Sequence, residues 1–266
     1  MRLWITVLAL TTATAGAAAE IAGSGATTAQ TARYADERWA ALEDVDELLT
    51  VGKYEAAVER LEELVAEDPD DIEAAWRLGK AYVDIGEVEA EVGSEDETRD
   101  YYRRGVDQLR AARALDPEHP DVNFNLAIAI GRHSLMGGNG DKVRGSREVK
   151  ELALKTIEID PDHDGAYHLL GRWHREVASL GFFTKALVRV VYGGFPDASY
   201  EQALEHFRRA YAIEPRMAHR LEIGIVLDEM GREDEARAVF EEVLEMESDH
   251  VDAWLMRAEA QRRLSS

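Results

Sequence analysis

The stretch LALKTIEIDPDHDGAYHLLGRW, residues 152–173, has the pattern of two helices joined by a tight turn. Apolar residues recur three and four positions apart on both sides of Asp160-Pro161, which is typical of amphipathic helices. Proline has no amide hydrogen and starts helices well, and the aspartate before it can hydrogen-bond the backbone of the turn. Gly171 follows Pro161 by ten residues. A residue this small lets two helices approach closely.

The same pattern occurs four more times along the chain. The other copies are LEELVAEDPDDIEAAWRLGKAY (61–82), LRAARALDPEHPDVNFNLAIAI (109–130), FRRAYAIEPRMAHRLEIGIVL (207–227) and FEEVLEMESDHVDAWLMRAEA (240–260). Each copy has a small residue at the position of Gly171, and these residues are Gly79, Ala127, Gly224 and Ala258. A tandem repeat of helix, turn and helix is the signature of tetratricopeptide proteins.

The copies lie farther apart than a minimal tetratricopeptide repeat of about 34 residues. Successive turn prolines are separated by 48, 44 and 54 residues. We therefore predict lengthened helices or insertions near residues 87–100, 135–148 and 181–199. The predicted fold is all-α, a tetratricopeptide-like helical-repeat solenoid of about five helix pairs over residues 34–266, with an inserted amphipathic helix.

The first residues predict export. Residues 1–19, MRLWITVLALTTATAGAAA, combine one cation, a short apolar run and small side chains, which is the pattern of a cleavable signal peptide. The alternative is a permanent membrane anchor, but the apolar run is too short to span about 30 Å of hydrocarbon. We predict a signal peptide over 1–19, a flexible leader over 20–33, and a periplasmic or secreted mature protein.

The composition narrows the possible functions. The formal net charge is -22, so the surface of this acidic chain repels nucleic acid and anionic membranes at long range, and we expect no nucleic-acid partner. The chain has no cysteine, no Gly-x-Ser-x-Gly elbow and no His-Glu-x-x-His helix. We predict a non-enzymatic protein without a cofactor, and the oligomeric state stays open.

Residues 171–215, GRWHREVASLGFFTKALVRVVYGGFPDASYEQALEHFRRAYAIEP, resemble the regulator of microtubule dynamics family. In that family a Gly-Arg-aromatic start leads through a Val-(Ala/Ser)-x-Leu turn into an inserted apolar helix that ends Phe/Tyr-Gly-x-x-Pro. The resemblance extends over roughly residues 70–245. It implies an all-helical repeat domain without catalysis. Eukaryotic members are associated with microtubules and organelle contact sites, and one branch resembles a phospholipid-binding and transfer module.

The inserted helix, predicted over 181–195, carries one apolar stripe. The stripe either completes the core of the solenoid, or forms the wall of an acyl-chain groove, or touches a membrane beside the cations Lys185 and Arg189. The candidate residues of the stripe are Phe182, Phe183, Leu187, Val190 and Val191.

The first helix of each pair lines the concave surface of such a solenoid. These helices carry aromatic and cationic residues, which suit a peptide carboxylate or a phosphate headgroup. Pairing with nearby acids such as Asp84 and Glu176 is the alternative. The predicted concave-face binding residues are Trp76, Lys80, Phe124, Ile128, Arg132, His168, Arg172 and Arg175.

Two further segments have weaker patterns. Asp160, Asp162, His163, Asp164 and His168 resemble a metal cluster, but acids occupy the same turn in the other copies, so we expect a turn and no metal. LMGGNGDKVRGSREVK, residues 135–150, is interpreted as a flexible interhelix loop whose basic edge contacts an anionic partner.

The sequence is consistent with two functions. The first is a scaffold that captures a protein or peptide partner on the concave face. The alternative is a module that binds or transfers a phospholipid, fatty acid or other amphiphile in an apolar groove walled by residues 181–195.

Overall fold

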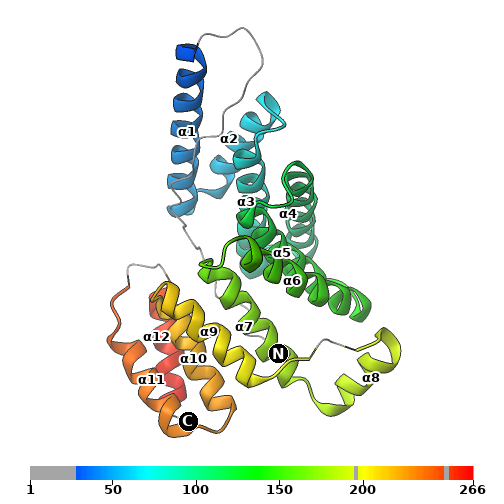
Figure 1. The fold of residues 1–266 in the computed structure, drawn as a ribbon, viewed down its shortest axis with the longest axis vertical. Coiled ribbons are helices and arrows are strands. Elements are labelled where there is room, and N and C mark those ends of the chain that lie inside the picture. The colour runs from blue at the N-terminus through cyan, green and yellow to red at the C-terminus, as the bar shows by residue number, and fades with distance from the viewer. Residues whose placement is uncertain (1–27, 195–196, 249–251, 266) are drawn as a thin grey trace. The chain divides into compact units, whose positions relative to one another are not determined.

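The computed structural model describes residues 28–194, 197–248 and 252–265. This part of the chain forms twelve α-helices and no strand (Figure 1). None of its helices is both long enough and apolar enough to cross a bilayer. The fold is the predicted all-α helical-repeat solenoid. The chain divides into two compact units, one ending at Leu115 and one that runs from Asp116 onward.

The N-terminal unit contains two helix pairs. Its helices pack in chain order, α1 on α2, α2 on α3 and α3 on α4. Apolar residues at helical spacing, among them Leu42, Leu61 and Leu78, form its core. The helices are α1 (Thr28–Thr50), α2 (Tyr54–Glu67), α3 (Ile72–Val92) and α4 (Glu95–Leu115).

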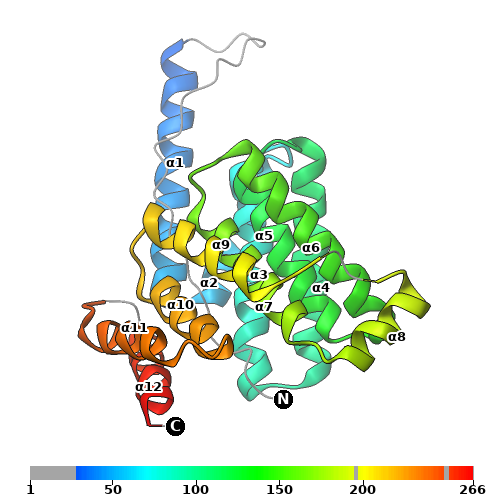
Figure 2. The same cartoon turned by 60° about the horizontal axis from the view of Figure 1, so that its bottom comes forward.

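The C-terminal unit contains three helix pairs, one insertion and a last helix. The pairs are α5 with α6, α7 with α9 and α10 with α11, and α12 packs on α10 and α11. Helix α8 is inserted between the two helices of the middle pair and lies at the edge of the unit, away from α10 to α12 (Figures 1 and 2). The helices are α5 (Pro120–Leu135), α6 (Asn139–Ile159), α7 (Asp164–Ser179), α8 (Phe182–Tyr192), α9 (Tyr200–Ile213), α10 (Met217–Glu229), α11 (Glu233–Glu245) and α12 (Ala253–Leu264).

The small residues hold paired helices together, as the repeat pattern predicts. A Cβ at position 79 would lie 2.5 Å from Cγ of Leu109, and one at position 171 would lie 2.8 Å from the ring of Phe207. Both distances are too short for real carbon atoms, so only glycine allows these helices to approach. The prediction is wrong for Ala258, which is exposed because α12 buries a different face.

The interpretation of residues 135–150 as a flexible loop is wrong. Helix α6 begins at Asn139, and the Asp141 carboxylate accepts a hydrogen bond from the Gly138 amide at 2.9 Å, which caps this end. Gly145 faces the Ser134 side chain, so it permits close packing against α5 where a larger residue would clash. The glycines suggested a loop, but the buried Val143 and Val149 belong to a helix.

Of the three places where lengthened helices or insertions are predicted, only one adds a helix. The spacing near residues 87–100 and 135–148 comes from long helices, since α3, α4 and α6 each have 21 residues. Helix α8 accounts for the insertion at 181–199. Helix α1 begins at Thr28, inside the segment predicted as a leader, while the predicted signal peptide lies outside the described residues.

Candidate functional site

The predicted concave-face residues fall in both units. Trp76 and Lys80 lie on α3 of the N-terminal unit. The other six lie on two helices of the C-terminal unit. These six are Phe124, Ile128 and Arg132 on α5, and His168, Arg172 and Arg175 on α7.

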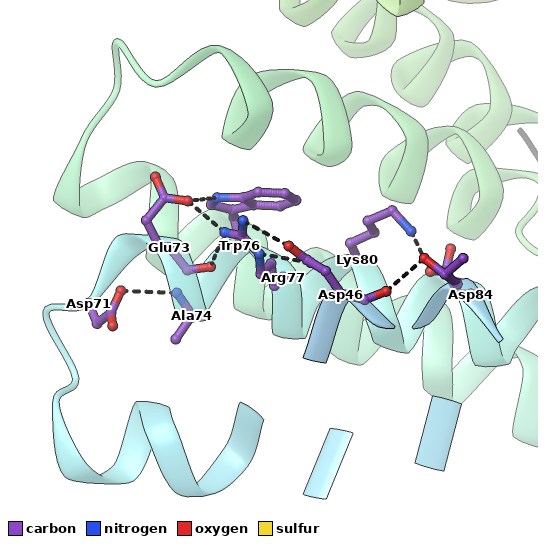
Figure 3. A network of polar contacts seen from close by, with 9 residues as sticks. Asp46, Asp71, Glu73, Ala74, Trp76, Arg77, Lys80 and Asp84 are labelled. Carbon is purple, nitrogen blue, oxygen red and sulfur yellow. Dashed lines mark hydrogen bonds and ion pairs between the residues drawn. The ribbon is translucent and has the colours of Figure 1, made fainter. Parts of the chain in front are cut away.

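In the N-terminal unit, both predicted residues are engaged by acids of the same unit (Figure 3). The Trp76 indole donates to Oε2 of Glu73 at 3.0 Å, and the Arg77 guanidinium lies 4.4 Å from the centre of the indole ring system. Lys80 Nζ lies 2.5 Å from Oδ2 of Asp84, so the pairing that the sequence left open is present. This part of α3 is a structural network.

Arg77 connects this network to a second helix. Its guanidinium donates to the carboxylate of Asp46 on α1 at 3.1 Å and to Glu73 at 2.6 Å (Figure 3). Burial opposes the charge of Arg77, but Asp46 and Glu73 outweigh it and raise its pKa. The arginine therefore remains charged and links α1 to α3.

In the C-terminal unit, α5 supplies core residues and one cation. Phe124 is buried, and its ring centre lies 4.5 Å from that of His163. Ile128 and Arg132 are half-buried. Phe124 therefore packs within the unit.

A set of polar side chains in contact, which we call the buried polar network, connects helices α7 and α10. Nδ1 of His168 lies 2.8 Å from Nδ1 of His219, and Nε2 of His219 lies 2.9 Å from Oδ2 of Asp164. Nε of Arg216 lies 3.1 Å from the same oxygen. His219 is completely buried, and His168 and Asp164 are nearly so. The buried polar network joins two neighbouring helix pairs through hydrogen bonds.

The charges of the side chains in the buried polar network follow from their contacts. Burial alone would raise the pKa of Asp164, but the hydrogen bond from His219 and the charge of Arg216 lower it, so the carboxylate is ionised. Burial lowers the pKa of His168 well below its usual range, and nearby cations lower it further. His168 is therefore neutral at neutral pH. When His219 is also neutral, it donates from Nε2 to Asp164 and accepts at Nδ1 from His168.

A cluster of three arginines, Arg132, Arg172 and Arg175, lies next to the buried polar network. Arg175 forms ion pairs with Glu222 of α10 and, at 2.9 Å, with Glu176. Nε of Arg172 lies 3.9 Å from Oε1 of Glu222. Burial lowers the pKa of Arg172, and the charges of Arg175 and Arg132 lower it further against the attraction of Glu222. Cations therefore crowd one another here although the whole chain is acidic.

We call this region the α7–α10 polar face. It comprises residues of α5, α7 and α10 in the C-terminal unit and the residue just before α10. These residues are Arg132, Asp164, His168, Arg172, Arg175, Arg216, His219 and Glu222. Sequence reasoning found the residues of α5 and α7 but missed those at the start of α10 and within it. The missed residues are Arg216, His219 and Glu222.

Helix α8 ends as the sequence indicates. Gly193 has a positive φ of 78°, and its amide bonds back to Arg189, which terminates the helix. Val190 and Val191 are 85% and 55% exposed, so they do not complete the core. Val188 is buried, and Lys185 Nζ donates to the Ala178 carbonyl at 2.8 Å. The side chains of Phe182, Phe183 and Leu187 lie outside the described ones.

The acidic turn before α7 has a structural role. Asp160 Oδ1 accepts from the amide of Asp162 at 3.0 Å, and His163 Nδ1 accepts from the amide of Ala166 at 3.1 Å. These bonds shape the turn and cap the helix. No group of three His, Cys, Asp or Glu side chains in the described ranges is arranged to hold a metal ion.

Comparison with known proteins identifies the family. Residues 41–266 match the family described as regulator of microtubule dynamics protein 1-3. The chain belongs to this family. Among its relatives are regulator of microtubule dynamics protein 3 of Rattus norvegicus, 28% identical over 164 residues, and protein 1 of Bos taurus, 26% identical over 174 residues.

The match covers 61% of this chain and 34% of the rat protein, and 65% of this chain and 54% of the bovine protein. The chain thus matches about a third to a half of these relatives. Among solved structures, a thermophilic tetratricopeptide protein of Thermus thermophilus aligns with a TM-score of 0.61 and 18% identity over 85% of this chain and 99% of that one. This likeness supports the tetratricopeptide fold of this family member.

Proposed function

We propose that this member of the regulator of microtubule dynamics family is a non-enzymatic scaffold that captures a protein or peptide partner on the α7–α10 polar face. The tetratricopeptide fold supports the general role. The names of its relatives point to regulators and not to enzymes. The role in microtubule dynamics that their names describe is not transferred to this chain, because the matched region is only part of their length.

The crowding of the arginines carries this proposal. Burial lowers the pKa of Arg172, and the charges of Arg175 and Arg132 lower it further, while Glu222 opposes this shift. A carboxylate from a partner would relieve the repulsion and accept a two-donor fork from a guanidinium. The chemistry therefore favours a peptide that presents an acidic side chain or its C-terminal carboxylate.

Selection from a displayed peptide library tests this proposal. Peptides selected on the wild type should contain a carboxylate. Their affinity should fall by roughly tenfold or more for Arg172→Gln or Arg132→Gln, because a charged hydrogen bond contributes about 1.5–3 kcal/mol. Arg103→Gln, which changes an exposed arginine on α4, is the control. Equal binding by all of these variants would overturn the proposal.

Lipid carriage in a groove walled by α8 is a second candidate. It is favoured by Val190 and Val191, whose apolar side chains face solvent. Native mass spectrometry with lipid extraction should find a stoichiometric phospholipid or fatty acid on protein purified without detergent. A mass equal to that of the bare chain contradicts carriage and leaves the scaffold proposal in place.

We also propose that the protein is exported. The pattern of residues 1–19 supports this proposal. N-terminal sequencing of the mature protein should start at Glu20. A mature protein that retains residues 1–19 would contradict cleavage.

A further inference from the structure

Helix α8 exposes aliphatic side chains. Val190 is 85% exposed and Val191 55%, while Val188 is 9% exposed. Residues 188 and 190 lie about 160° apart around a helix of 3.6 residues per turn, so Val190 points away from the side that packs. Val191 lies about 60° from Val188, at the border of the packed side, and is still 55% exposed. Such a surface gains free energy when an apolar medium covers it.

The same part of the unit is basic. Residues 182–192 contain Lys185 and Arg189 and no acid. The first half of α6, residues 141–150, adds four cations and only two acids. These four cations, which we call the basic edge, are Lys142, Arg144, Arg147 and Lys150.

The basic edge and α8 form one region. Arg147 Nη2 donates to the Gly194 carbonyl at 2.5 Å, just after α8 ends, and α6 contacts α8 directly. Lys142 and Arg189 are exposed, and the Arg144 side chain is 74% exposed although it pairs with Asp141. Residues 141–150 and 181–194 together hold six cationic and two acidic residues in a chain whose net charge is -22.

We propose that α8 and the basic edge dock the protein on the surface of an anionic phospholipid bilayer. Val190 and Val191 enter the boundary between headgroups and acyl chains, while the cations contact lipid phosphates. Exposed aliphatic residues beside lysine and arginine are what an interfacial helix requires. A soluble acidic partner would pair with the cations but leave the valines in water, so the combination favours a membrane.

The overall negative charge does not prevent this contact. At physiological ionic strength, charges farther apart than about 8 Å are largely screened. At contact, the bilayer therefore meets mainly the local positive region. Docking of this kind is distinct from capture of a peptide on the α7–α10 polar face.

Vesicle co-sedimentation of the full mature chain tests the proposal. The protein should sediment with vesicles of phosphatidylglycerol and phosphatidylcholine, and much less with pure phosphatidylcholine. Val190→Asp with Val191→Asp should weaken binding about tenfold or more, because charged groups do not enter the acyl region. Arg189→Glu with Lys142→Glu should weaken it about thirtyfold or more, since each of the two cations near an anionic surface contributes about 1 kcal/mol.

Val92→Asp is the matched control, because Val92 is 80% exposed on α3. This variant should bind like the wild type. Circular dichroism checks that each variant is folded, which the exposure of the substituted side chains favours. Failure of the wild type to bind anionic vesicles at low salt would overturn the proposal, and so would wild-type binding by the double aspartate variant. Neither result affects peptide capture.

Discussion

Nδ1 of His168 on α7 lies 2.8 Å from Nδ1 of His219 on α10, and both rings are buried. Only one hydrogen fits between these nitrogens, so one ring donates and the other accepts. A doubly protonated pair would place two N–H groups against each other. The contact between these helix pairs therefore requires at least one neutral ring.

The first prediction is that acid destabilises the C-terminal unit. Burial lowers the pKa of His168 and of His206, and it lowers that of His174 to about 4. The unfolded chain binds these protons more readily than the folded one. The contribution of these neutral histidines to stability is fully present above pH 6.5, the approximate pKa of histidine in the unfolded chain. This contribution is lost as the pH falls toward 4. For His174 alone, the loss reaches about 3 kcal/mol below pH 4.

Urea unfolding at a series of pH values measures this effect. His174→Phe is the informative variant, because Nδ1 of His174 is buried without a hydrogen-bond partner and the ring stacks on His206. Its stability should fall less steeply between pH 6.5 and 4 than that of the wild type. Parallel curves for the two proteins would refute the role of His174.

The second prediction concerns the contact between α7 and α9. A Cβ at position 171 would lie 2.8 Å from the completely buried ring of Phe207, so Gly171→Ala should destabilise by about 1–3 kcal/mol. Gly131→Ala is the control, because its Cβ would lie 3.5 Å from Val149, an ordinary contact. Alanine favours helices over glycine, so this control should stabilise by up to about 1 kcal/mol. Thermal unfolding of both variants decides the point.

The sequence predicts contacts within a pair well and contacts between pairs poorly. Gly79 and Gly171 repeat in register, and their close approach to the partner helix follows from that register alone. The contact of His168 with His219 joins residues 51 positions apart, and it depends on how one pair stacks on the next. The available signal was that His168 and His219 both lie on first helices, a few residues before Gly171 and Gly224.

The surface of α8 was also only partly predictable. Helical register groups Val190 and Val191 into a stripe, and the sequence contains the glycine that ends the helix. Whether that stripe faces the core depends on which side of the helix packs against the unit. The burial of Val188 and the hydrogen bond of Lys185 determine that side, and sequence periodicity contains neither.

The third prediction concerns the Asp164 carboxylate. Asp164→Asn keeps the shape but removes the charge that His219 and Arg216 contact, so it should destabilise by about 2–4 kcal/mol. Asp162→Asn, two residues earlier, changes a side chain that is 79% exposed and should stay within about 0.5 kcal/mol of the wild type. Chemical denaturation measures the free energy of unfolding of both variants. Equal effects would show that the buried polar network does not stabilise the unit.

The final prediction separates stability from binding at Glu222. This carboxylate pairs with Arg175 and lies 3.9 Å from Arg172, so it offsets part of the arginine repulsion. Glu222→Gln removes that charge and should destabilise the free protein by about 3–5 kcal/mol. It also leaves the arginines more positive, so an acidic peptide should bind the folded variant about tenfold more tightly. Titration calorimetry with a selected peptide gives the affinity, and Glu176→Gln, whose side chain is 35% exposed, should change both quantities less. Weaker peptide binding by folded Glu222→Gln would mean that the partner is not held by its negative charge.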